Sequence, residues 1–240
     1  MSLTYSQFVT SYANLLVVGT GDAGFQTMLP NSIDDAEQRL YRDLQLLNTV
    51  VRDSSIAFTT GTRTFNLPSA QGTFYVVDSI YAITPAGTVN PDLGTHNYLT
   101  PASRSFIDAL FPSSAGSGVP QYFAPTTQNA YIVGPWPDQA YQAEVVGTIR
   151  PAALSSTNVT TLLSWYFPDL WIAGNMIFGA AYQQNFGASG AVDNPAQAVN
   201  WESHYNALLK SAATEETMKK FTSQGWSSKA PAELATPPRT

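Results

Sequence analysis

The sequence predicts an α+β protein with a helical bundle core, an inserted antiparallel β lobe and an extended C-terminal tail. The bundle takes its two N-terminal and its two C-terminal helices from opposite ends of the chain. Apolar residues recur at three- and four-residue spacing near both ends, which is typical of amphipathic helices. Short β-rich runs divided by Gly, Pro, Asn and Ser clusters fill the middle. The final segment, GWSSKAPAELATPPRT, shows neither pattern and indicates the tail.

The first helix is predicted to begin after Thr4. Thr4 with Gln7 three positions later is a capping-box pattern, and an apolar stripe begins at Phe8. Gly19 is the expected C-terminal stop of this helix. The segment GTGDAG, which begins at Gly19 and ends at Gly24, is therefore expected to be a loop.

A second helix is predicted from the segment SIDDAEQRLYRDLQLL, which begins at Ser32. The helix could begin a few residues earlier, with Pro30 tolerated in its first turn. With the start at Ser32, Asp34, Asp35 and Glu37 lie in the first turn, where carboxylates interact favourably with the helix dipole. We interpret these three residues as part of the helix start and not as a metal or acid-base site.

The β-rich lobe is predicted between residues 49 and 154. Runs such as TFYVVDSIYAIT and YQAEVVGTI indicate an antiparallel sheet or a small sandwich. Within the lobe, Ser103 to Phe111 indicates a short helix or turn. The segment GPWPDQAY is expected to be a hairpin turn whose Trp136 packs on the sheet. The alternative is that Trp136 and Tyr131 form an aromatic platform for sugars.

The helical pattern returns at Pro168, a favourable first position of a helix. The segment PDLWIAGNMIFGAAYQQNFG is apolar on nearly all sides and rich in Gly and Ala, so we expect a central, closely packed helix that ends at Gly187. Asn194 and Pro195 signal the start of the last helix. It could run to about Gln224, which is longer than a compact core of this size requires.

These patterns predict three parts of the chain. Residues 1–48 and 155–224 would form the helical core domain, residues 49–154 the inserted β-rich lobe, and residues 225–240 the extended tail. Six large apolar or aromatic residues are expected to pack in the core or between subunits: Leu40, Leu44, Trp171, Trp201, Tyr205 and Leu208.

The composition favours an assembled protein. Only 12% of the residues are charged, about half of the usual share, so much of the surface is expected to be covered. The absence of cysteine excludes disulfide frameworks, thiolate zinc sites and cysteine nucleophiles. No basic residue precedes Arg39, so a secretory signal is not expected. The longest apolar stretch, which contains Asn175, has about 13 residues and is too short to span a membrane.

No pattern in the sequence predicts a catalytic, cofactor or metal site. Gly19, Gly21 and Gly24 match Gly-x-Gly-x-x-Gly in form, but a capped helix is predicted where a dinucleotide site requires a strand. His96 is placed in a Gly/Pro-rich loop and His204 on the last helix, and neither has a partner at zinc-binding spacing. We expect both histidines at a surface or an interface. The protein is expected not to be an enzyme, while an enzyme that binds a cofactor through Gly19 to Gly24 and a serine hydrolase stay open as alternatives.

Four stretches of the sequence resemble head-to-tail adaptor (connector) proteins of tailed bacteriophages, which form a ring beneath the portal. They are MLPNSIDDAEQRLYRDLQLLNT (28–49), VPQYFAPTTQNAYIVGPWPDQAYQAEVVGTIRPAAL (119–154), FPDLWIAGNMIFGAAYQQNFG (167–187) and WESHYNALLKSA (201–212). These stretches are patterns of packing residues. The resemblance therefore implies an architecture and no catalytic residues.

The resemblance implies a viral structural protein of the virion neck, assembled in the host cytoplasm. About twelve copies would form a homo-oligomeric ring that docks on the portal protein and provides the platform for a downstream tail, nozzle or stopper protein. The net charge of −6 and the lack of basic clusters beyond one Lys-Lys pair would let genomic double-stranded DNA pass through the channel without tight binding. The residues expected to reach the portal are Lys219, Lys220, Phe221, Trp226 and Lys229. The alternative function is a carbohydrate- or receptor-binding, tail-associated module that uses the aromatic β lobe.

Overall fold

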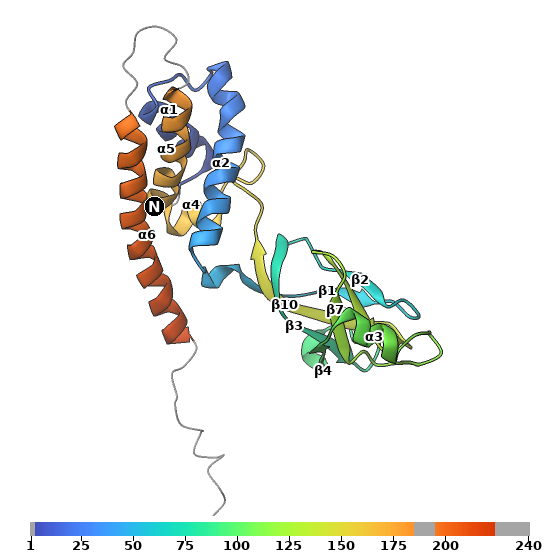
Figure 1. Ribbon diagram of the computed structural model, residues 1–240. Coiled ribbons are helices and arrows are strands. Elements are labelled where there is room, and N and C mark those ends of the chain that lie inside the picture. The colour runs from blue at the N-terminus through green and yellow to red at the C-terminus, as the bar shows by residue number, and fades with distance from the viewer. Residues whose placement is uncertain (1–2, 185–194, 224–240) are drawn as a thin grey trace, which may run out of the picture. The chain divides into compact units, whose positions relative to one another are not determined.

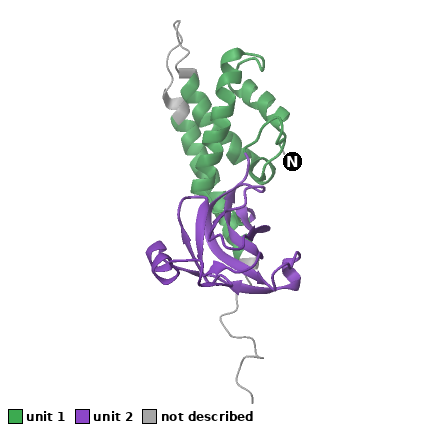
Figure 2. Ribbon diagram, turned by 90° about the vertical axis from the view of Figure 1, so that its right-hand side faces the viewer, with its two compact units in different colours: residues 1–47, 153–240 green, residues 48–152 purple. Residues whose placement is uncertain are grey.

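A computed structural model describes residues 3–184 and 195–223 (Figure 1). The chain divides into two compact units (Figure 2). Residues 1–47 and 153–240 form the first, which we call the helical unit, and residues 48–152 form the second, which we call the β unit. Helices and mostly antiparallel sheets are both present, so the predicted α+β class is confirmed.

The helical unit is organised around α5, the most apolar of its long helices. This helix contacts α1, α2, α4 and α6, which confirms the prediction of a central buried helix. Its predicted end at Gly187 lies outside the described residues. The helices of the unit are α1 Tyr5–Leu15, α2 Ala23–Asp43, α4 Leu162–Tyr166, α5 Pro168–Gln184 and α6 Pro195–Ser223.

Helices α1 and α5 approach each other closely at Gly179. A Cβ atom at this position would lie 2.6 Å from the Tyr12 hydroxyl oxygen and 2.8 Å from Leu16 Cδ2, so a larger residue would require these two side chains to shift. Tyr12 stacks on Phe8, and the Phe8 ring centre lies 4.0 Å from that of Trp171. These aromatic rings form the centre of the helical core.

The end of α1 differs from the prediction. The helix ends at Leu15, and the left-handed backbone conformation falls on Val17, with φ of 56°, instead of on Gly19. The Val18 amide donates to the Ala13 carbonyl at 3.0 Å, which closes the helix end before the glycine is reached. The prediction of Gly19 as the helix stop is therefore wrong.

Helix α2 begins earlier than predicted. Its N-cap is Asp22, whose carboxylate accepts a hydrogen bond from the Phe25 amide at 2.8 Å. Gly24 therefore lies in the first turn of a helix and not in a loop. Pro30 lies inside α2, where an interior proline costs about 3 kcal/mol. Burial of apolar side chains on both sides of Pro30 offsets this cost, because each contributes roughly 1.5–3 kcal/mol.

The β unit consists of two four-stranded sheets and one short pair of strands. The first sheet has the order β1-β10-β3-β4 and is antiparallel throughout. The second has the order β2-β8-β7-β5, in which only the short β5–β7 pair is parallel, and β6 pairs with β9 in parallel. The strands are β1 Val50–Phe58, β2 Thr64–Asn66, β3 Thr73–Thr84, β4 Thr95–Tyr98, β5 Thr100–Pro101, β6 Ser117–Gly118, β7 Tyr122–Pro125, β8 Ala130–Gly134, β9 Trp136–Pro137 and β10 Tyr141–Arg150.

One apolar core connects the two four-stranded sheets. Phe58, Ile80 and Val145 come from the first sheet, and Phe123 and Val133 come from the second. Of the two arrangements that the sequence allowed, the β unit therefore has the small sandwich. The short helix expected near its middle is present as α3, Arg104–Leu110, and a 3₁₀ turn, η2, spans Pro91–Leu93.

The segment GPWPDQAY is not a hairpin. Strand β8 before it belongs to the second sheet and β10 after it belongs to the first, so the segment crosses between the sheets. Its two prolines lack the amide hydrogens that a ladder would require. Trp136 nevertheless packs within the unit, because its indole N–H donates to the Phe111 carbonyl at 3.2 Å and the Arg63 guanidinium lies 5.5 Å from its ring centre.

Candidate functional site: the last helix and the polar anchors of the helical unit

Helix α6 is attached to its unit along a single stripe. Tyr205, Ala212 and Glu216 are buried, and Trp201 and Leu208 are half-buried against the helical core. Most other side chains between residues 199 and 220 are exposed. Within residues 199–220, a large part of the surface of α6 is therefore not covered by the described residues of its unit.

The other residues that were expected to pack lie in the same core. Leu40 of α2, Leu44 directly after the end of α2, and Trp171 of α5 are buried in the helical core. Trp201 and Leu208 keep part of their surface accessible to solvent. Among these six residues, those two have surface left for contact with a neighbouring subunit.

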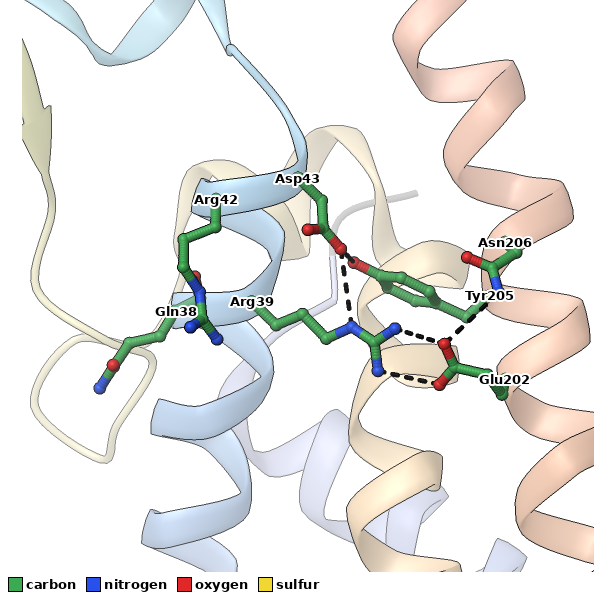
Figure 3. A network of polar contacts seen from close by, with 7 residues as sticks. All are labelled: Gln38, Arg39, Arg42, Asp43, Glu202, Tyr205 and Asn206. Carbon is green, nitrogen blue, oxygen red and sulfur yellow. Dashed lines mark hydrogen bonds and ion pairs between the residues drawn. The ribbon is translucent and has the colours of Figure 1, made fainter.

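A polar network, which we call the clasp, joins α2 to α6 (Figure 3). Arg39 donates two hydrogen bonds to the Glu202 carboxylate, one of them at 2.9 Å, and its Nε lies 3.6 Å from Asp43 Oδ2. The guanidinium carbon lies 4.4 Å from the centre of the Tyr205 ring. The Tyr205 hydroxyl in turn donates to Asp43 at 2.7 Å. Arg39, Asp43 and Tyr205 thus close a ring of contacts between the two helices, and Glu202 binds Arg39 from α6.

Electrostatics keep the clasp in one protonation state. The hydrogen bonds to Glu202 raise the pKa of Arg39, and the same pair lowers the pKa of Glu202. Burial, followed by the hydrogen bond to Asp43, raises the pKa of Tyr205. At neutral pH the cation, the carboxylate and the neutral phenol are therefore all maintained, which suits a structural contact.

Two buried glutamates, which we call anchors, bind backbone amides of the unit. The first, Glu216, lies near the C-terminal end of α6. The buried Glu216 accepts a hydrogen bond from the Leu47 amide at 2.9 Å and another from Lys219 Nζ at 2.9 Å. Lys219 also pairs with Glu215 at 2.6 Å and lies 5.1 Å from the Phe167 ring centre. Burial alone would lower the pKa of Lys219, but its hydrogen bonds to the two glutamates raise it overall. Lys219, one of the residues expected to reach the portal, is thus engaged within its own unit.

The remaining residues expected to reach the portal lie at or beyond this end of α6. Lys220 Nζ lies 3.5 Å from Gln45 Oε1. The side chain of Phe221, and the whole of Trp226 and Lys229, lie outside the described residues. A groove of about 190 Å³ adjoins this part of α6, and it is lined by Tyr166, Phe167, Asp169, Leu170, Leu208, Ser211, Ala212 and Glu215.

The second anchor, Glu37, comes from α2. Glu37 is 3% exposed and accepts a hydrogen bond from the Leu154 amide at 3.1 Å. Burial raises the pKa of Glu37 to about 7, the Leu154 amide opposes that shift, and the charge of Asp34 adds to it. The prediction that Glu37, Asp34 and Asp35 complement the dipole at a helix start is wrong, because α2 begins at Ala23.

The core also contains a polar cluster that sequence reasoning missed. The Tyr12 hydroxyl oxygen lies 2.8 Å from Ser32 Oγ and donates to the Asn175 carbonyl at 2.9 Å. The Asn175 side chain accepts from Ser32 at 3.2 Å and donates to the Trp171 carbonyl at 2.9 Å. Burial raises the pKa of Tyr12 to about 12. The one available signal was Asn175 itself, a polar residue within an apolar helix.

The two histidines lie in different surroundings. His96 belongs to β4, so the prediction of a loop position is wrong. Its Nε2 lies 3.6 Å from Glu144 Oε2, and Arg52 Nε lies 3.4 Å from the other oxygen of that carboxylate. His204 is exposed on α6, next to the Trp201 ring. In the part of the chain that the structure describes, no three His, Asp or Glu side chains converge as metal ligands.

The glycine pattern lies between two helices. α1 precedes Gly19 and Gly21, and Gly24 belongs to α2, so the strand that a dinucleotide fingerprint requires is not at this position. None of the helices in the described ranges is both long and apolar enough to cross a membrane.

The fold and its contacts define an α+β protein whose buried polar side chains connect helices to one another and to nearby backbone. The chain matches the family model described as SU10 adaptor protein over residues 3–228 and therefore belongs to that family. It is thus a phage adaptor protein with a structural role in the virion, and the resemblance noted in the sequence is confirmed. A search of curated proteins finds no match to the sequence.

Proposed function

We propose that the protein forms the head-to-tail adaptor ring of a tailed phage, with about twelve copies docked on the portal. Family membership supports an adaptor role. The observation that carries the docking proposal is the attachment of α6. This helix has 29 residues and a length of about 44 Å, yet between residues 199 and 220 the described part of its unit buries only one stripe of it.

The exposed part of α6 has the chemistry of a contact surface. Val199 and Met218 expose large apolar side chains near its two ends, at 67% and 64%. Such side chains contribute little to the stability of a single chain, whereas they would be buried in an assembly. In this proposal the segment from Lys219 onward, with Trp226 and Lys229, faces the portal, and neighbouring helical units close the ring through heterologous contacts.

The charge of the chain fits a DNA channel. The net charge is −6, and the 11 Lys and Arg residues do not form a large cluster along the sequence. Tight binding would require several phosphates to be neutralised together. A weakly acidic ring would therefore let double-stranded DNA slide through on its way to the tail.

The structure favours this function over the carbohydrate-binding alternative. A sugar platform needs an aromatic face and polar groups that are available to a ligand. The indole N–H of Trp136 is already used by the Phe111 carbonyl, and the Arg63 guanidinium lies over its ring. These contacts support a packing role for Trp136 within the β unit.

Docking is tested by mixing the full chain with assembled portal rings and measuring the added mass by native mass spectrometry. A chain that ends at Gly225 should add to the portal at least about tenfold more weakly, because it lacks Trp226 and Lys229. Lys220→Glu should weaken addition in the full chain, whereas Lys210→Glu, the same change on an exposed residue earlier in α6, should not. Equal addition by the truncated and full chains would rule out the proposed role of the tail.

A further inference from the structure

The helical unit holds the chain at both places where it passes to or from the β unit. The first part of the helical unit ends at Leu47, and the second part begins at Ala153. The Leu47 amide donates to Glu216 of α6 at 2.9 Å, and the Leu154 amide donates to Glu37 of α2 at 3.1 Å. Each crossing is therefore bound by a carboxylate from a helix far away in the sequence.

Both of these glutamate side chains are buried. Glu216 is 6% exposed and Glu37 is 3% exposed. A buried carboxylate loses much of its hydration, and a neutral side chain of similar shape would often be tolerated better. A backbone amide in the same place needs an acceptor, however, and the side-chain oxygen of a glutamate supplies one. A buried glutamate accepts a hydrogen bond from a backbone amide at both crossings, Leu47 and Leu154. This indicates that both glutamates position the chain there.

Only one of the two anchors is connected to the exposed end of α6. Glu216 also accepts a hydrogen bond from Lys219, which pairs with the exposed Glu215. Glu37 has a different neighbour, Asp34, whose negative charge disfavours its ionised form. A partner that draws Lys219 away from Glu216 would thus alter the first crossing and leave the second unchanged.

We propose that Glu37 and Glu216 are positioning residues that fix the two crossings, and that Lys219 links the crossing at Leu47 to the exposed end of α6. A partner that binds the end of α6 would then change the hydrogen bond between Glu216 and the Leu47 amide, without itself contacting Leu47. This inference goes beyond the adaptor function, because it does not depend on which partner reaches α6.

Amide hydrogen exchange of the full chain, resolved by residue with NMR, tests the two anchors. Glu216→Leu should speed exchange of the Leu47 amide by about tenfold or more and leave the Leu154 amide unchanged. Glu37→Leu should produce the opposite pattern. Glu216→Gln and Glu37→Gln keep a carbonyl acceptor and should change exchange by less than about threefold. Equal acceleration of both amides by either Leu variant, or no change in either, would overturn the proposal.

The link through Lys219 has its own test, which also remains available if a Leu variant does not fold. Lys219→Met removes the cation beside Glu216 and should speed exchange of the Leu47 amide by about threefold, with the Leu154 amide unaffected. Lys210→Met, on an exposed part of the same helix, is the matched control and should change neither amide. Unchanged Leu47 exchange in Lys219→Met would contradict the link, whether or not the protein binds a portal.

Discussion

The two units of the chain fix the positions of their elements in different ways. In the β unit, backbone hydrogen bonds align β10 with β1 and β3, and the core between the sheets is made of apolar and aromatic side chains. In the helical unit, polar side chains connect one element to another inside or beside the core, as in the cluster around Tyr12, the anchors Glu37 and Glu216, and the clasp. A helix uses its backbone hydrogen bonds internally, so only side chains can specify its neighbour and its register.

The largest expected difference between the units is a pH dependence of the free energy of unfolding that is caused by Glu37. Its pKa is about 7 in the folded protein and near 4.5 for an unburied glutamate, so the folded state retains the proton more strongly. Stability should therefore fall as pH rises from about 4.5 to about 7, by up to about 3 kcal/mol. Glu37→Gln cannot lose a proton and should remove this loss, so that at pH 8 the variant is the more stable protein.

Urea denaturation at pH 4.5 and pH 8 measures the effect of Glu37→Gln. The variant and the unmodified chain should have similar free energies of unfolding at pH 4.5, because Glu37 is then protonated in the folded state and about half protonated in the unfolded state, so little of the loss has occurred. Asp35→Asn, an exposed site on the same helix, is the control and should leave the pH profile unchanged. A Glu37→Gln profile parallel to that of the unmodified chain would show that Glu37 does not titrate in this range.

The same chemical change in each unit should give unequal results. Tyr12→Phe removes a buried hydroxyl and leaves Ser32 and the Asn175 carbonyl short of a partner, so it should lower the free energy of unfolding by about 2 kcal/mol. Tyr141→Phe in the β unit removes a hydrogen bond to the exposed Asp138, which water can replace, and should cost about 0.5 kcal/mol. Urea titrations followed by residue-resolved amide exchange provide both values. Similar costs for the two variants would contradict the contrast between the units.

The clasp should contribute a smaller amount, because it is partly exposed to solvent. Arg39→Lys loses the two-fold hydrogen bond to Glu202 and the contact with the Tyr205 ring. The Glu202 side chain is 39% exposed, so screening limits the expected loss to about 1 kcal/mol. Amide protection in the first half of α6 should fall accordingly. Arg42→Lys is the control, since Arg42 of the same helix is exposed and its Nε donates to the nearby Gln38 carbonyl at 3.2 Å.

The smallest expected effect is a gain in stability at the end of α1. Val17 holds a left-handed conformation that costs a non-glycine residue about 1–2 kcal/mol, and its side chain is 90% exposed. Val17→Gly should raise the melting temperature by a few degrees, because about 0.5–1 kcal/mol remains after the greater flexibility of glycine in the unfolded chain. Val17→Ala retains the strained Cβ and should show no such gain. A lower melting temperature for Val17→Gly would mean that the exposed valine stabilises the chain.

Local patterns in the sequence were sufficient for several elements of the fold. The capping box of Thr4 and Gln7 begins α1 as predicted, and α6 begins at Pro195 and extends almost to Gln224. Such signals act within a few residues, so a single sequence reveals them. The start of α2 was missed because Pro30 resembles a helix start, although burial on both sides keeps it inside the helix.

Features that depend on distant contacts could not be predicted. Helix α4 is capped by Thr161 and Ser164, a local signal that lacks the usual Glu or Gln and an apolar repeat of sufficient length. The hydrogen bond between Glu37 and Leu154 joins residues 117 positions apart, and no local spacing indicates it. The segment around Trp136, which connects the two sheets of the β unit, was interpreted as a hairpin because a turn pattern does not specify which sheet receives the next strand.

The interrupted course of the helical unit has a consequence for synthesis on the ribosome. The β unit is one continuous segment and is complete before α5 has been made. α1 and α2 emerge first, but the central helix that covers Phe8 and Phe25 follows only after the whole β unit. At usual rates of translation, synthesis of the β unit takes on the order of ten seconds, and during this time the apolar faces of α1 and α2 are not covered by α5. In a newly made chain, the part that begins first is therefore the part that is completed last.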